Sequence, residues 1–250
     1  MYIWYHRFAK DRVLTAKTSR SFSLVRAFFY AAATLLALCF VASGCKASNG
    51  QPESASSSAT GSSTQSSETI VMMRHGEKPI GGLGQLNCMG LNRSLALPKV
   101  LIGRFGRADA VFAPNPADRM RESSFSPRSY SYVRPLATIE PTAIQLGLPV
   151  NTQMSFADIA GLQSAVTAPV YANSTIFMAW EHKYAYDFAR QMLRSHGLDP
   201  SQVPAWPSDD FETMYVFHIT RTAATRAPAM TFAVQQEGLE GSLSGTCPSP

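Results

Sequence analysis

Three places in the chain carry side chains that could act on an anionic substrate. Arg74 and His75 follow the apolar run 70–73, and Arg134 and His182 come later in the chain. Guanidinium groups bind the dianion of a phosphate monoester with paired hydrogen bonds. An imidazole can act as the nucleophile and carry the phosphoryl group. These residue types therefore predict phosphoryl transfer, which also needs an acid to protonate the leaving oxygen.

The elements that must position these side chains are short apolar runs alternating with segments of helical periodicity. Strands are predicted at 70–73, 108–113, 149–152, 174–180, 212–220 and 230–235, and helices at 90–105, 135–146, 155–166 and 183–196. The stretch 115–131 is polar and is expected to be irregular. Such an alternation predicts an α/β fold with a mostly parallel central sheet between two helical layers, a three-layer α/β/α sandwich. Because ligands bind beyond the carboxyl ends of such strands, His75 and His182 are expected to reach the same crevice.

Four segments in this order resemble the histidine phosphatase superfamily, which also contains the phosphoglycerate mutases. Residues 73–79, MRHGEKP, resemble the RHG signature, and residues 84–93 resemble the loop and helix start that follow it. Residues 134–143, RPLATIEPTA, resemble the segment with the second phosphate-binding Arg, and residues 179–182, AWEH, the strand end with the second His. The resemblance covers about residues 69–220. RHG alone is not specific, but the ordered set is.

The resemblance implies a phosphoglycerate mutase-like fold and a phosphatase that hydrolyses small phosphorylated substrates without metal or other cofactor. His75 would form a phosphohistidine, while Arg74, Arg134 and His182 would bind the phosphoryl oxygens. A non-catalytic lipoprotein that keeps this pocket and binds phosphate or another polyanion is the alternative.

The acid has two candidates. The family often places a carboxylate about 25 residues after its second Arg, and Asp158 lies 24 residues after Arg134. Glu181, which directly precedes His182, is the alternative. We favour Asp158 as the acid.

Other residues near these motifs have simpler interpretations. Glu77 and Lys78 are expected to line the rim of the pocket or to pair with each other. Arg119, Arg121 and Arg128 are either a solvated loop or a means of selecting a polyanionic substrate. The sequence has no HExxH motif, no CxxC pair and no phosphate-binding P-loop, so no metal site is predicted.

The basic character of the chain belongs to its first 44 residues. They hold six Lys or Arg and one Asp, which accounts for the whole net charge of +5 over 250 residues. The remainder is neutral overall, so nucleic acid is not an expected partner. An uncharged apolar stretch then leads to Ala42-Ser43-Gly44-Cys45, which resembles the lipobox of bacterial lipoproteins.

We therefore expect a signal peptide and lipobox over 1–45, with Cys45 lipidated and the protein on the periplasmic side of a bacterial membrane. An uncleaved N-terminal helix as membrane anchor is the alternative. Lys46 in place of Asp favours the outer membrane.

The rest of the chain divides by composition. Residues 46–68 are Ser-rich without large apolar side chains, which predicts a disordered linker. The phosphatase-like domain is expected over 69–238, followed by a tail rich in Gly, Ser and Pro over 239–250. Cys88 and Cys247 are the cysteines left for the domain and its tail, and an oxidising compartment makes a disulfide between them a prediction.

Overall fold

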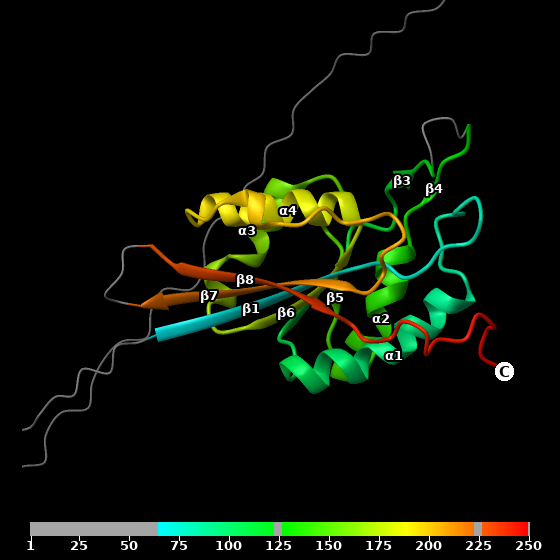
Figure 1. The fold of residues 1–250 in the computed structure, drawn as a ribbon, viewed down its shortest axis with the longest axis horizontal. Coiled ribbons are helices and arrows are strands. Elements are labelled where there is room, and N and C mark those ends of the chain that lie inside the picture. Colours follow the sequence, from blue (N-terminus) through cyan, green and yellow to red (C-terminus); the bar gives the residue numbers. More distant parts are fainter. Residues whose placement is uncertain (1–64, 123–126, 223–226, 250) are drawn as a thin grey trace, which may run out of the picture. The chain divides into compact units, whose positions relative to one another are not determined.

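A six-stranded sheet forms the centre of the fold, with the strand order β5-β2-β6-β1-β7-β8 (Figure 1). The computed structural model describes residues 65–122, 127–222 and 227–249. The strands of the sheet are β1 (Gln65–Arg74), β2 (Ala110–Phe112), β5 (Val150–Asn151), β6 (Thr175–Trp180), β7 (Thr213–Thr222) and β8 (Ala229–Gln236). The pairings β1–β6, β6–β2 and β2–β5 are parallel, whereas β1–β7 and β7–β8 are antiparallel. The predicted mostly parallel sheet is confirmed.

Helices cover both faces of this sheet. They are α1 (Cys88–Phe105), α2 (Arg134–Leu146), α3 (Ile159–Val166) and α4 (His182–Ser195), with short 3-10 turns at Pro169–Tyr171 and Pro200–Gln202. Figure 1 shows α1 and α2 on one side of the sheet and α3 and α4 on the other. The three-layer α/β/α architecture predicted from the alternation is therefore present.

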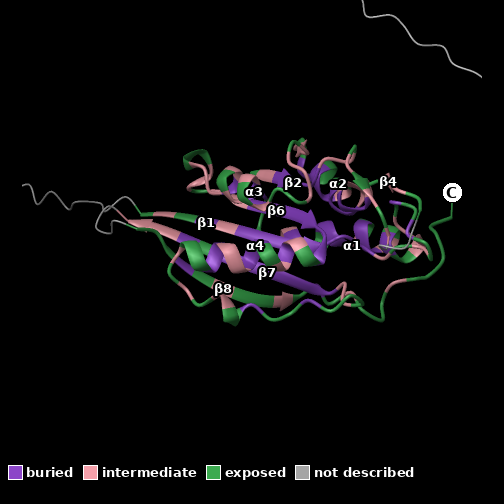
Figure 2. Ribbon diagram, turned by 90° about the horizontal axis from the view of Figure 1, so that it is seen from above, coloured by how far each residue is buried: buried purple, intermediate pink, exposed green. Residues whose placement is uncertain are grey.

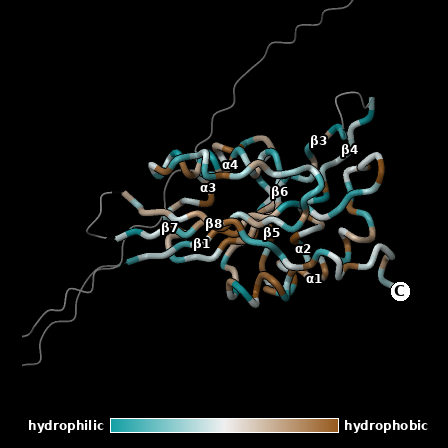
Figure 3. The backbone as a smooth tube through the Cα atoms, in the orientation of Figure 1, coloured by the Kyte–Doolittle hydropathy of each residue, from teal (hydrophilic) through white to brown (hydrophobic). Residues whose placement is uncertain are grey.

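Each face of the sheet has its own apolar core, and β1 contributes to both. Ile70 and Met72 belong to the cluster that contains the buried residues of α3 and α4, while Val71 and Met73 belong to the cluster with α1 and α2. This split follows from the period of two along a strand. The central strands are buried through most of their length (Figure 2), and apolar stretches concentrate in them and along parts of α1 (Figure 3).

Several element boundaries differ from the prediction, most of all the start of β1. β1 begins at Gln65 rather than at Ile70, because residues 65–69 continue its antiparallel pairing with β7. Glu68 is fully buried there, and Arg221 Nη2 donates to its Oε2 at 2.6 Å. The disordered linker predicted to end at residue 68 is therefore too long by four residues. Residues 1–64, including Cys45 and the rest of that linker, lie outside the described residues.

The stretch predicted as irregular contains a short antiparallel pair, β3 (Arg119–Met120) with β4 (Tyr130–Ser131). It lies at the end of the sheet where β1 and β6 end (Figure 1). Two-residue strands give no periodicity in the sequence, which explains why the pattern did not predict them.

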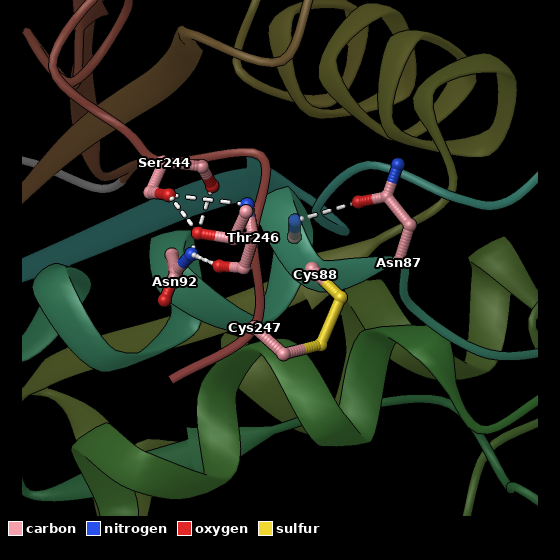
Figure 4. Close-up of a disulfide and its surroundings, with 7 residues drawn as sticks. Asn87, Cys88, Asn92, Ser244, Thr246 and Cys247 are labelled. Atoms are coloured by element: carbon pink, nitrogen blue, oxygen red, sulfur yellow. Dashed lines mark hydrogen bonds between the residues drawn. A yellow bond between two sulfur atoms is a disulfide. The ribbon is translucent and has the colours of Figure 1, made fainter. Parts of the chain in front are cut away.

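The C-terminal tail is fastened to the start of α1. Cys88 and Cys247 form a disulfide with their Cα atoms 4.5 Å apart (Figure 4). Asn92 Nδ2 donates to the carbonyl oxygens of Ser244 and Thr246, both at 2.8 Å. The tail therefore packs on the domain as far as the structure describes it. Within the same described ranges, no helix has both the length and the apolar character required to cross a membrane.

Candidate active site

The ends of two neighbouring parallel strands bring His75 and His182 to one place. Arg74 is in register with Trp180 across β1 and β6, and the backbone N–H of His75 donates to the carbonyl of Trp180 at 2.9 Å. His182 then begins α4. The sheet thus places both histidines at its carboxyl-end crevice, as the motif order predicts.

A cavity of about 480 Å³ opens at this point. It is lined by Arg74, His75, Lys78, Met120, Arg121, Glu122, Arg134, Glu181, His182, Lys183, Tyr184 and Ser208. Five of these side chains are Lys or Arg, and two are carboxylates. The lining therefore favours an anionic ligand.

His75 is held in one tautomer by its own loop. It is 2% exposed, and its Nδ1 lies 2.7 Å from the carbonyl oxygen of Gly76. Because a carbonyl oxygen can only accept a hydrogen bond, Nδ1 carries the proton and Nε2 carries the lone pair. The backbone N–H of Gly76 in turn donates to Thr138 Oγ1 at 2.9 Å, which ties the loop to α2. Nε2 is therefore the nitrogen that can attack.

Burial, and after it the guanidinium of Arg134, lowers the pKa of His75 well below its usual range. Arg74 and Lys78 act in the same direction, and the hydrogen bond to Gly76 opposes them. The imidazole is consequently neutral near pH 7, which is the state a nucleophile needs.

The two arginines are buried and keep donors unused. Arg74 and Arg134 are 2% and 1% exposed, and the Nε of each is buried without a hydrogen-bond partner in the part of the chain that the structure describes. Burial lowers the pKa of Arg74 to about 10, which still leaves it charged at neutral pH. Arg74 Nη1 donates to the carbonyl of Asp210 at 2.7 Å, and its guanidinium lies 3.9 Å from the ring centre of Phe211. An unpaired buried donor costs about 1–3 kcal/mol, so this arrangement suits ligand binding better than stability.

Glu181 is the N-cap of α4. Its Oε2 accepts hydrogen bonds from the backbone N–H groups of Lys183 at 2.8 Å and Tyr184 at 3.2 Å. Its Oε1 lies 2.7 Å from Nδ1 of His182, without a hydrogen bond between them. Burial acts to raise the pKa of Glu181, but the contact with His182 and the two N–H donors outweigh it and lower the pKa. Glu181 is therefore an ionised carboxylate at neutral pH and a poor proton donor.

Asp158 does not line the cavity, which corrects our first choice for the acid. It is exposed, and its Oδ1 accepts the backbone N–H of Gly161 at 2.9 Å as the N-cap of α3. The interval between Arg134 and Asp158 does not distinguish a catalytic acid from a helix N-cap, because Asp is also a preferred N-cap residue. Of the six predicted site residues, the structure brings together His75, Arg74, Arg134, His182 and Glu181.

Lys78 lines the cavity, which was one of the two expectations for Glu77 and Lys78, but the sequence analysis missed the partners of both residues. Instead of pairing with each other, Glu77 contacts Arg93 at 2.7 Å and Lys78 contacts Glu122 at 2.8 Å. Glu122 also contacts Arg134 and is the second carboxylate of the cavity. No motif marked Glu122, since its place depends on the unpredicted β3–β4 pair.

No group of three or more His, Cys, Asp or Glu side chains within residues 65–122, 127–222 and 227–249 is arranged to hold a metal ion.

No protein-family model matches the sequence, and no curated protein is significantly similar to it. Solved structures are similar in fold. One is a candidate phosphohistidine phosphatase, SixA, from Nakamurella multipartitia, with 16% identity over 68% of this chain and 96% of that chain and a TM-score of 0.45. A mycobacterial glucosyl-3-phosphoglycerate phosphatase with bound inorganic phosphate has 13% identity over 68% and 97% of the two chains and a TM-score of 0.45. A phosphoserine phosphatase variant from Entamoeba histolytica has 11% identity over 68% and 98% and a TM-score of 0.40. At these values the assignment of function has to rest on the cavity itself.

Proposed function

We propose that this protein is a phosphatase that hydrolyses phosphate monoesters through a phosphohistidine on His75. The observation that carries the proposal is the fixed tautomer of a buried, neutral imidazole beside two buried guanidinium groups. Arg74 and Arg134 supply the positive charge that a phosphoryl group needs both when it binds and during its transfer.

In the proposed first step, Nε2 of His75 attacks phosphorus and the bond to the ester oxygen breaks. The leaving oxygen takes a proton from solvent water and departs as an alcohol. In the second step, water attacks the phosphohistidine, the N–P bond breaks, and inorganic phosphate leaves. Glu181, as an ionised carboxylate in the same cavity, is suited to accept the proton of that water.

The test is turnover of 4-nitrophenyl phosphate, with trapping of the labelled enzyme without acid. Nitrophenolate is a good leaving group, so the assay does not depend on a proton donor. The wild type should turn over in the presence of a chelator and form an acid-labile label. His75→Ala should lose both, with turnover reduced by several orders of magnitude. Wild-type turnover in His75→Ala would exclude the phosphohistidine route. Phosphate binding without turnover in the wild type would support the non-catalytic alternative.

We also propose that the protein is exported and anchored by lipid at Cys45. The support is the basic leader, the uncharged apolar stretch and the small residues before Cys45. Metabolic labelling with a fatty acid should mark the wild type, and Cys45→Ser should lose the label and either leave the membrane fraction or remain unprocessed. Cys39→Ser, in the same leader, is the matched control. Unchanged labelling of Cys45→Ser would reject the lipobox.

A further inference from the structure

Glu122 lies where an anionic ligand would compete with it. Its Oε1 contacts Nη1 of Arg134 at 2.5 Å, and its Oε2 contacts Nζ of Lys78 at 2.8 Å. The side chain is 10% exposed. Burial acts to raise the pKa of Glu122, but the hydrogen bonds from Lys78 and Arg134 outweigh it, so the pKa is lowered and the group is ionised.

The backbone at Gly82 makes room for this carboxylate. A Cβ atom at Gly82 would lie 1.7 Å from Cδ of Glu122, and the φ of Gly82 is +74°. The carbonyl of Gly82 also lies 3.4 Å from Nη1 of Arg134. A side chain at position 82 would therefore push Glu122 off its two cations, so the loop after His75 is shaped around the carboxylate.

Glu122 engages two of the five cations that line the cavity, Lys78 and Arg134. Arg74 directs Nη1 to backbone carbonyls, whereas Arg134 directs Nη1 to the carboxylate and, at 3.4 Å, to the carbonyl of Gly82. A carboxylate and a phosphoryl group present the same kind of oxygen pair to a guanidinium. Glu122 thus occupies part of the binding capacity of the cavity with a single negative charge.

We infer that Glu122 is an internal competitor that sets the specificity of the cavity. This inference rests on the proposed phosphate site, although it does not require turnover. A ligand that displaces the carboxylate from Arg134 and Lys78 must bind them more strongly than a charge of minus one does. A phosphate dianion meets this requirement, whereas a carboxylate monoanion does not. Glu122 therefore selects phosphate monoesters in their dianionic form.

The first experiment measures the affinity for inorganic phosphate at pH 8 by isothermal titration calorimetry, and KM and kcat for 4-nitrophenyl phosphate. Glu122→Gln should bind phosphate about tenfold more tightly or better, and KM should fall to match, with kcat changed by less than threefold. Acetate should inhibit Glu122→Gln and leave the wild type unaffected. The matched control is Glu140→Gln, which removes one charge from an exposed position on the same helix as Arg134.

A second variant distinguishes the effect of the contacts that Glu122 makes from the effect of its negative charge. Glu122→Asp keeps the negative charge, but its shorter side chain cannot keep both contacts. If Glu122 competes through contact, Glu122→Asp should also bind phosphate more tightly, by roughly threefold or more. It also serves as the test if Glu122→Gln does not fold.

Unchanged or weaker phosphate binding in both variants would overturn the inference. So would a large fall in kcat with unchanged KM, which would assign Glu122 to proton transfer. Because calorimetry needs no turnover, a wild type that binds phosphate but hydrolyses nothing would defeat the proposed function and leave this test intact.

Discussion

Arg93 binds the carboxylate of Glu77 and so fixes the position of the backbone two residues after His75. Nη2 of Arg93 donates to Oε1 of Glu77 at 2.7 Å, and Nε donates to Oε2 at 3.1 Å. Its remaining Nη1 contacts Glu212 and Glu237. Burial acts to lower the pKa of Arg93, but these three carboxylates outweigh it and raise the pKa. One buried cation thus joins the loop after His75 to the start of β7 and the end of β8.

Arg93→Met should destabilise the domain by about 3–5 kcal/mol, because it leaves the acidic groups of Glu77, Glu212 and Glu237 without their shared cation. Urea denaturation of the purified protein measures the free energy of unfolding. Lys99→Met, at an exposed position of the same helix, should change it by less than about 0.5 kcal/mol. Equal effects of the two substitutions would contradict a structural role for the Arg93 contacts.

Glu237 should make the domain less stable as the pH rises. It is 1% exposed, its Oε1 has no hydrogen-bond partner within the described ranges, and burial raises its pKa to about 8. A carboxyl group whose pKa is higher in the folded state contributes stability that is complete below the unfolded pKa of about 4.3 and is lost as pH rises through the folded pKa.

The clearest window for this effect is pH 7–8, since an unfolded histidine, with a pKa of about 6.5, is then mostly neutral, as His75 with its lowered pKa is in the folded state. The free energy of unfolding should fall in this window with a slope approaching about 1.4 kcal/mol per pH unit from Glu237. Glu237→Gln should remove that slope and be more stable than the wild type at pH 8.5. A parallel pH dependence of the two proteins would show that Glu237 titrates normally.

The Cys88–Cys247 disulfide should stabilise the domain by about 5 kcal/mol in the chain-entropy model, because it closes a loop with a sequence separation of 159. Non-reduced peptide mapping by mass spectrometry of protein isolated without reductant should recover the two cysteines as one linked peptide. Cys247→Ser should lower the midpoint of urea denaturation in oxidising buffer, and dithiothreitol should remove the difference between variant and wild type. Free thiols at both positions would contradict the bond.

Asp158→Asn and Glu181→Gln should separate the two carboxylates that the sequence left as candidates. Asn caps a helix as well as Asp does, so Asp158→Asn should leave stability within about 0.5 kcal/mol and turnover unchanged. Glu181→Gln removes the charge beside His182 and should lower kcat for 4-nitrophenyl phosphate by 10–100-fold. A loss of activity in Asp158→Asn would restore the original choice.

His75 should appear as a neutral imidazole protonated on Nδ1 throughout pH 6–8. Nitrogen-15 NMR of histidine-labelled protein, assigned by comparison with His75→Ala, distinguishes this tautomer directly. A titration of His75 near pH 6.5 would contradict both the burial and the effect of Arg134.

The sequence predicted what depends on local pattern and on the order of motifs. The apolar runs before His75 and His182 predicted strands, and the strand ends then had to meet at one edge of a parallel sheet. The sequence did not predict Glu122, because its position depends on pairings of only two residues each. Asp158 was misjudged for a related reason, since distance along the chain does not report whether a side chain faces a cavity or caps a helix.

The central position of β1 in the sheet has a consequence for how the chain folds. The first strand of the described residues lies in the middle of the sheet, and its partners are residues 175–180 and 213–222. Nearly all of the chain must therefore be synthesised before the central strand can pair on both sides. Because these pairings join segments that are distant in the sequence, the contact order of the domain is high and the pairings form slowly. The nascent chain therefore stays open until late in synthesis. Under the proposed export, this delay would keep the polypeptide unfolded for its passage through the membrane.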